Sequence, residues 1–521
     1  MSSVRTGLML LAAAGVAACA VGPNYHTPRT PTPDHYDAAV TMGSVAAMSG
    51  PTTPANSASP PAPVDMAAWW HALGDPELDS LVARAIIGNP DLSVALDRLQ
   101  AARTFEAAVI GTVLPVAEGS AGAGHGTGTD LARGRASSTL VSADNDQGLK
   151  HINEIGGFDA VWELDIFGKY RREIEAARYD TQATIAARNV VLLTVIADVA
   201  RAYVDLRGLQ VRASVVNQAV AVLRESLRIV NLRYERGITN ELDVTLATRE
   251  LATLEAQQAP VEAQVRAAEY TIATLLGLYP EELVAELSAT AMVPAVPGTV
   301  AAGLPLDLLR RRPDVREAER ELAGATARIG VATANLFPAL AVTGAVGFQR
   351  QSQGSLPVLG QHIWSAGPTA QWPLLDFGAL DAQVEIADLQ TRALLVVYKQ
   401  TIQGAVREVD TNLGLYSAQQ ASLEKLGTAL LASQRAVTLA NERYERGLTD
   451  FLNVVDAERQ EYDIEEQYAA TQVAAAEGFV ELFRSLGGGW ENYQSLPPIH
   501  RPEPAIIAMF QRTLSRSDPL K

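Results

Sequence analysis

Long stretches with apolar residues at helical spacing alternate along the chain with short stretches in which apolar and polar residues alternate. Residues 169–236 and 379–446 keep the helical spacing throughout and contain no proline. Each is followed by a second helical stretch, 240–277 and 450–486. At about 1.5 Å per residue, the longer stretches predict helices of about 100 Å. Helices of this length are typical of coiled-coil rods, so we expect two antiparallel helical hairpins.

A period of two predicts β-strands between the helical stretches. Even-numbered positions are mainly apolar over residues 158–166, 340–348 and 364–374, and the pattern is weakest near 119–128. Alternation over about ten residues is typical of transmembrane strands, whose apolar side faces lipid and whose polar side faces a lumen. A half-buried strand of a soluble sheet gives the same pattern, and that alternative stays open at this point.

The chain contains one unit twice. Residues 231–249 and 441–459 nearly repeat each other at an offset of 210, which also relates Trp162 to Trp372. Upstream the offset is 223, because the first copy has a longer loop before Trp162. Such an internal repeat indicates an architecture built from two copies of one structural unit. If the alternating stretches cross a membrane, both tryptophans belong to the aromatic girdle at its interface.

The two copies share the sequence YERG at the end of their long helical stretch. Its glycines are Gly237 and Gly447. A glycine directly after a helix commonly adopts the left-handed conformation that ends it. We therefore expect each glycine to form the turn at the tip of a helical hairpin.

Each copy offers helix, strand, loop, strand and helix, so the chain has four predicted strands. Four strands cannot close a barrel, and open sheet edges are not tolerated in hydrocarbon. Known membrane barrels have at least eight strands, so several chains must share one barrel. Three chains would supply twelve strands, which makes a trimer the preferred oligomer.

The N-terminus has the pattern of a secretory signal. Arg5 precedes an apolar run over residues 8–18, which is too short to span a bilayer. Small residues then precede Cys19, the only cysteine of the chain, and this resembles the cleavage box of bacterial lipoproteins. We expect cleavage before Cys19 and its acylation with chains such as palmitate, which anchor without spanning. An ordinary signal peptide with an incidental thiol is the alternative.

These patterns divide the chain into five segments. We expect a lipoprotein signal peptide at 1–18 and a lipidated tether rich in Pro, Ser and Thr, extended and poorly packed, at 19–68. Repeat 1 covers 69–285, with a helix, two strands and a long helical hairpin. Repeat 2 covers 286–486 with the same unit, and 487–521 form a C-terminal tail.

Composition and charge exclude several functions. The net charge of −17 has no basic patch to offset it, so we expect no nucleic-acid partner. Aromatic residues make up only 6% of the chain, which favours long helices packed on small side chains. Phosphate-binding and nucleophile motifs are absent, and the seven histidines lack metal-ligand spacing. We predict no enzyme activity, catalytic residue, cofactor or metal site.

Several short motifs, in order, carry a resemblance to a known family. They are CAVGPNY at 19–25, RRPDV at 311–315, NLFP at 335–338, LLDFG at 374–378 and the two YERG turns. Together they resemble the TolC-like outer-membrane efflux factors, in particular the lipidated NodT-like branch. The resemblance implies an α+β membrane protein, a homotrimer in which each chain gives four strands to a shared twelve-stranded β-barrel. It further implies that the barrel continues into a long tunnel of antiparallel coiled-coil helices, closed at the helical tips.

The resemblance also implies a gate at these tips. An aspartate nine positions after the second turn glycine forms an acidic ring in the family, and Asp456 matches it. Leu452 matches a leucine ring found nearby in some members. This chain has Asn453 where a second aspartate can stand, so its constriction is expected to have a single acidic ring. A solvated helix carboxylate is the ordinary alternative for Asp456.

A latch between the two hairpins is implied in the same way. It joins an aspartate of the first copy to a tyrosine and an arginine of the second, and Asp243, Tyr444 and Arg459 hold those positions. Ordinary surface packing is the alternative for Tyr444 and Arg459. Exposed bonds of this kind contribute on the order of 1 kcal/mol each, so such a latch can be released.

The resemblance implies a passive exit duct in the outer membrane of a Gram-negative bacterium, lipid-anchored and extending into the periplasm. It would pass drugs, metals or other small toxic compounds from a periplasmic adaptor and an inner-membrane transporter to the exterior, as in multidrug resistance. Two alternatives stay open: a duct for type I protein secretion, and a structural coiled-coil lipoprotein without a pore.

Overall fold

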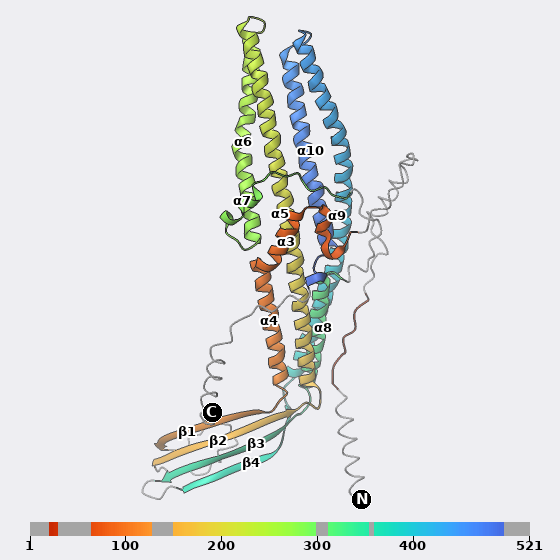
Figure 1. The fold of residues 1–521 in the computed structure, drawn as a ribbon. Coiled ribbons are helices and arrows are strands. Elements are labelled where there is room, and N and C mark those ends of the chain that lie inside the picture. Colours follow the sequence, from red (N-terminus) through yellow and green to blue (C-terminus); the bar gives the residue numbers. More distant parts are fainter. Residues whose placement is uncertain (1–19, 30–63, 128–149, 298–310, 354–358, 494–521) are drawn as a thin grey trace. The chain divides into compact units, whose positions relative to one another are not determined.

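The computed structural model describes residues 20–29, 64–127, 150–297, 311–353 and 359–493. In these residues helices predominate and a single four-stranded sheet is formed (Figure 1). Short helices connect the longer elements: η1 (Met66–Leu73), α3 (Pro76–Gly88), η3 (Pro280–Glu282), α7 (Val284–Leu287) and η5 (Glu491–Tyr493).

The longer helices repeat at the two offsets seen in the sequence. In each hairpin the first helix has 67 residues and the second has 35. The helices of the second hairpin lie 210 positions after those of the first. The helices before the strands have 22 residues each and are related by 223. The pairs are α5 (Lys169–Glu235) with α9 (Ala379–Glu445), α6 (Glu241–Leu275) with α10 (Phe451–Ser485), and α4 (Pro90–Gly111) with α8 (Pro313–Ala334). The predicted repeat and both helical hairpins are confirmed.

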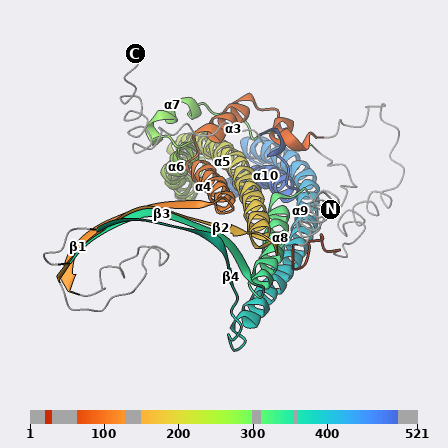
Figure 2. The same cartoon turned by 90° about the horizontal axis from the view of Figure 1, so that it is seen from below.

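The four strands form one antiparallel, curved sheet in sequence order (Figure 2). They are β1 (Val116–Thr127), β2 (Lys150–Leu164), β3 (Ala339–Gln353) and β4 (Leu359–Gln371). Among the described residues β1 pairs only with β2, and β4 only with β3. Both outer strands therefore present a free edge.

Two strands end earlier than the alternation predicts. The pattern extended to 166 and 374, whereas β2 ends at Leu164 and β4 at Gln371. Asp165 is used instead to begin α5, because its carboxylate accepts hydrogen bonds from the backbone N–H groups of Tyr170 and Arg171. β4 ends at Gln371 because its partner there, Ala339, is the first residue of β3. Apolar periodicity continued through both turns and did not mark these ends.

The described residues separate into two compact units that cut across the sequence repeats. One unit contains Ala101–Ile185, Arg316–Gln400 and residues 20–29, and it includes the whole sheet. The other contains residues 64–100, Ala186–Val315 and the described residues from Thr401 onward. Each unit takes segments from both repeats, and in the second unit α6 contacts its equivalent α10.

The second unit has a large hydrophobic core formed by helices of both repeats. Trp69 of η1 is fully buried and stacks on Phe483 of α10, with ring centroids 5.9 Å apart. One stretch of α5 is long and apolar enough to cross a membrane, but 61% of it is buried within the chain. Val199, Ala200 and Tyr203 of α5 are fully buried in this core, and this burial explains the apolar character of α5.

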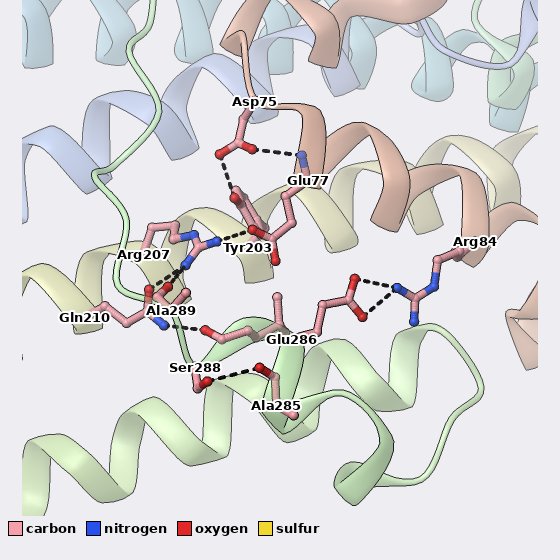
Figure 3. Close-up of polar contacts among 11 residues, drawn as sticks. Asp75, Glu77, Arg84, Tyr203, Arg207, Gln210, Ala285, Glu286, Ser288 and Ala289 are labelled. Atoms are coloured by element: carbon pink, nitrogen blue, oxygen red, sulfur yellow. Dashed lines mark hydrogen bonds and ion pairs between the residues drawn. The ribbon is translucent and has the colours of Figure 1, made fainter.

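A buried polar network holds α3 and α7 against α5 in the same unit (Figure 3). Arg207 of α5 is 1% exposed and donates to Glu77 at 2.6 Å, to Gln210 at 2.7 Å and to the carbonyl of Ala289 at 2.7 Å. Tyr203 donates to Asp75 at 2.6 Å. Because a buried guanidinium needs several acceptors, this network fixes the three segments in one arrangement.

Candidate functional site

The register of the sheet gathers large apolar side chains on one face. Phe158 of β2 pairs with Val346 of β3, which pairs in turn with Trp364 of β4. These side chains are 67%, 59% and 79% exposed. A contiguous apolar face of this kind is unusual on a water-soluble surface and is typical of the lipid-facing side of a membrane barrel.

The opposite face of the sheet is mostly polar or small, with Val116, Val161 and Ile363 as exceptions. Glu118 of β1 pairs with Asp159 of β2, followed across the sheet by Ala345 and Ser365. Thr343 and Thr369 continue this face, and each hydroxyl donates to a backbone carbonyl of the neighbouring strand. The alternation predicted from the sequence is confirmed, with a face suited to a water-filled lumen.

Trp162 and Trp372 have equivalent hydrogen bonds in the two copies. The indole N–H of Trp162 donates to the carbonyl of Val113 at 3.0 Å, and that of Trp372 donates to the carbonyl of Leu336 at 3.1 Å. Both side chains are about half exposed, and Trp372 lies one residue after β4. Indoles with a satisfied N–H and an exposed ring suit a membrane interface. Their place in a girdle stays a prediction.

The start of the predicted tether is packed, so the expectation of a loose segment is wrong for residues 20–29. Arg172 of α5 is buried and donates to the carbonyls of Val21 and Gly22 and to the side chain of Asn24, at 3.1, 3.2 and 2.8 Å. The N–H of Val21 donates to the carbonyl of Phe167 at 3.1 Å. Composition alone missed these contacts because they join residues about 150 positions apart. Cys19 lies outside the described residues.

Two further contacts fix this segment. Gly22 has a φ of +89°, and a Cβ there would lie 2.4 Å from the Cα of Gly330 in α8. Only glycine fits this close approach. The hydroxyl of Tyr25 donates to Glu319 at 3.2 Å, and burial is the main reason that the pKa of Tyr25 is raised. The end of the predicted tether is packed as well, since η1 begins at Met66.

The YERG turns end the long helices with the same geometry in both copies. Gly237 and Gly447 have φ values of +72° and +70°. The N–H of Ile238 donates to the carbonyl of Arg233 at 2.9 Å, and the N–H of Leu448 to that of Arg443 at 2.9 Å. This bond pattern is the Schellman motif, in which a left-handed glycine satisfies the last carbonyls of a helix.

The predicted gate residues lie on the uncovered side of α10. Phe451, Val454 and Val455 point into a core between the two hairpins, with Val230 of α5 and Ala247 of α6. Leu452 and Asp456 are instead 56% and 62% exposed. Asp456 forms an ion pair with Arg459, one turn away, at 3.5 Å.

The predicted latch residues have other partners within the chain. Asp243 accepts a hydrogen bond from the hydroxyl of Thr239, and Arg459 pairs with Asp456. The guanidinium of Arg233 lies 4.3 Å from the ring centroid of Tyr444. Among the described residues no hydrogen bond or ion pair joins Asp243, Tyr444 and Arg459. The buried hydroxyl of Tyr444 has no hydrogen-bond partner there.

The two copies differ at one tip position. Asn453 donates to the hydroxyl of Thr449 at 2.9 Å, which is the counterpart of the contact between Thr239 and Asp243. The second copy therefore keeps this local hydrogen bond, but Asn453 is neutral where Asp243 is a carboxylate.

Sequence reasoning missed Glu458, a buried carboxyl group on α10. It is 8% exposed, and its Oε1 accepts a hydrogen bond from the hydroxyl of Ser226 on α5 at 3.0 Å. Burial raises the pKa of Glu458 to about 7. The spacing from Phe451 through Val454, Val455 and Glu458 to Tyr462 follows one helix face and was the available signal.

Comparisons with known proteins agree with this geometry. The family model described as "Outer membrane efflux protein" matches residues 81–278 and 304–488. Nodulation protein T of Rhizobium leguminosarum bv. viciae is 29% identical over 91% of this chain and 92% of that protein. The toluene efflux pump outer membrane protein TtgI of Pseudomonas putida is 30% identical over 81% of this chain and 87% of that protein.

A solved structure shows the same fold. The outer-membrane channel OprN is 33% identical, with a TM-score of 0.77 over 91% of this chain and 100% of that chain. The family match covers both helical hairpins and all four strands of the sheet, so it includes both parts of the candidate site. The chain belongs to the outer membrane efflux protein family.

Proposed function

We propose that the chain is the exit duct of a tripartite efflux system in the outer membrane of a Gram-negative bacterium. One observation carries this proposal: a sheet with one apolar and one polar face, joined within a single chain to helices of 67 residues. Such a sheet suits a lipid-facing wall around water, and such helices suit a tunnel. The protein is a transport duct and not an enzyme.

The free edges of the sheet support a shared barrel. β1 and β4 each pair with one strand only among the described residues. Unpaired backbone groups in hydrocarbon cost several kcal/mol each, so each edge needs a strand from a neighbouring chain. Three chains give twelve strands, enough for an open lumen. We therefore propose a homotrimer in which β4 of one chain pairs with β1 of the next.

The surface of α9 supports the same assembly. Unlike α5, α9 leaves several large apolar side chains half exposed or more: Ile386, Leu389, Val396, Leu415 and Leu431. Apolar residues repeated along one long helix are typical of an interface. In the proposed trimer these side chains of α9 pack on the helices of adjacent chains.

The exposed residues of α10 support a gate. Three copies of Asp456 meeting at the axis would repel one another and attract cations, while Leu452 narrows the same opening. Because Asp243, Tyr444 and Arg459 have other partners within one chain, we propose that the latch forms between chains. Each bond would contribute on the order of 1 kcal/mol, so the tips can open.

The names of the relatives support the proposed partners. TtgI is an outer membrane protein of a toluene efflux pump, which indicates a small toxic compound as cargo. We propose that a periplasmic adaptor and an inner-membrane transporter deliver such compounds to this duct. Acylated Cys19 would anchor each chain in lipid, next to the packed residues 20–29.

Conductance of the purified protein in planar lipid bilayers tests this function. The proposal expects a small resting conductance that rises in Asp456→Ala, because removing the acidic ring weakens the constriction. A protein that inserts but never conducts, in either form, would instead be a structural lipoprotein. Growth of a deletion strain on a panel of toxic compounds would then identify the cargo.

A further inference from the structure

A cavity of about 210 Å³ lies between the four helices of the two hairpins. It is lined by residues of α5, α6, α9 and α10, all of them in one compact unit. Leu223 and Leu254 supply apolar wall, and Gln434 supplies a polar amide. The cavity is large enough for several water molecules or for a small organic molecule.

The lining of this cavity has an excess of negative charge. It contains four carboxylates, Glu250, Glu458, Glu461 and Glu465, and one cation, Arg459. Arg459 is already paired with Asp456, and Glu250 lies 3.6 Å from Arg249. Among the described residues, Glu458, Glu461 and Glu465 have no ion-pair partner. Three carboxylates therefore line one cavity without a compensating charge.

Glu458 is the least exposed of these carboxylates. It is more than nine-tenths buried, its Oε1 is held by Ser226, and its Oε2 has no hydrogen-bond partner in the described part of the chain. Burial raises the pKa of Glu458, Glu461 and Glu465 alike. A buried carboxylate without a partner is costly, so this oxygen calls for a donor from a ligand or for a proton.

The arrangement suits an organic cation better than a metal ion. The described residues contain no group of three or more acidic, histidine or cysteine side chains placed to hold a metal. Glu458, Glu461 and Glu465 instead follow one face of α10 over two turns, about 10 Å. A linear molecule with a cationic group at each end can reach carboxylates so spaced, while its hydrocarbon part packs on Leu223 and Leu254.

We propose that this cavity is a binding site for a small alkyl diamine, whose ammonium groups pair with Glu458 and Glu465. The site lies between the hairpins, so it goes beyond the proposed duct and its gate. Bound diamine bridges α5, α6 and α10 and stabilises the packed tips. It also displaces the proton that Glu458 otherwise holds, because ammonium favours the ionised carboxylate.

Isothermal titration of the intact purified protein with 1,5-diaminopentane tests the site. Binding should be about tenfold tighter at pH 8 than at pH 6, where only about a tenth of a carboxyl with a pKa near 7 is ionised. Glu458→Gln should weaken binding at pH 8 at least tenfold and remove most of its pH dependence. The matched control is Glu424→Gln, an exposed carboxylate on α9, which should bind like the wild type.

Several outcomes would overturn the proposal. Equal binding by the wild type and Glu458→Gln would exclude the cavity, and loss of binding only in Asp456→Asn would move the cation to the gate. Equal affinity for Mg²⁺ would exclude selectivity for an organic cation. If Glu458→Gln does not fold by circular dichroism, Glu465→Gln, which is less buried, serves instead and should weaken diamine binding severalfold.

Discussion

The packing of the helical tips should weaken as the pH rises, because Glu458 is buried between the two hairpins. Its pKa is raised to about 7, mainly by burial, from an ordinary value near 4.5. A raised pKa means that the stabilisation is complete below the ordinary value and is lost as the pH rises through about 7. Between pH 6 and pH 8.5 this change corresponds to about tenfold in the opening equilibrium, or about 1.4 kcal/mol.

Other charged groups face Glu458 and set the background of this measurement. They are Glu250 on α6 and Arg459, Glu461 and Glu465 on α10, while Ser226 and Gln434 face it from α5 and α9 without charge. Because Glu461 and Glu465 also have raised pKa values, they act in the same direction. The difference between the wild type and Glu458→Gln isolates the contribution of Glu458.

Hydrogen exchange followed by mass spectrometry measures tip opening directly. After correction for intrinsic exchange rates, peptides from residues 221–235 and 451–465 should open about tenfold more at pH 8.5 than at pH 6. Glu458→Gln should lose most of this dependence, whereas the exposed control Glu424→Gln should keep it. An equal pH dependence in the wild type and Glu458→Gln would refute the assignment of the effect to Glu458.

Three further predictions follow from named contacts. Gly447→Ala should destabilise its turn by about 1 kcal/mol, because φ is +70° with nothing within 4 Å of the new Cβ; faster exchange at the tip checks this, and unchanged exchange would contradict it. Arg207→Met should lower the free energy of unfolding in denaturant by about 3 kcal/mol, because it leaves Glu77 unpaired. Arg84→Met removes an exposed ion pair and should lower it by less than about 1 kcal/mol, and equal losses would refute the role of burial. Asp243→Ala with Tyr444→Phe should raise resting conductance by more than either change alone but by less than the two single effects together, because each change breaks the same latch; additive or absent effects would argue against a latch.

The helices and their ends were largely predictable from the sequence, because the repeat supplied each boundary twice. The turn glycines, the alternation of the sheet and the four-strand count depended on local patterns that long-range contacts do not override. Strand ends were less predictable, since Asp165 turns to α5 and β4 ends where its partner β3 begins, while the apolar period continues past both points. The packed start of the predicted tether depended on Arg172, about 150 positions away.

Glu458 shows a different limit of sequence reasoning. A glutamate on a long polar helix is usually solvated, and only its position on the apolar face of α10 distinguishes it. The contact of Arg233 with Tyr444 was likewise unpredictable. It joins the two repeats, and the sequence of neither YERG turn indicates which residue of the other repeat it contacts. Both features depend on how the two hairpins pack together.

Crosslinking between sheet edges tests the shared barrel most directly. Ala117→Cys on β1 is combined in turn with Ala366→Cys or Ala370→Cys on β4, and the purified membrane protein is treated with a dimaleimide of about 8 Å. Within one chain β1 and β4 are three strand spacings apart, about 14 Å, so this reagent joins only edges of neighbouring chains. The account predicts covalent dimers and trimers with at least one pair. The account would be contradicted if both double-cysteine variants gave only monomers after crosslinking and the protein migrated as a single chain in detergent.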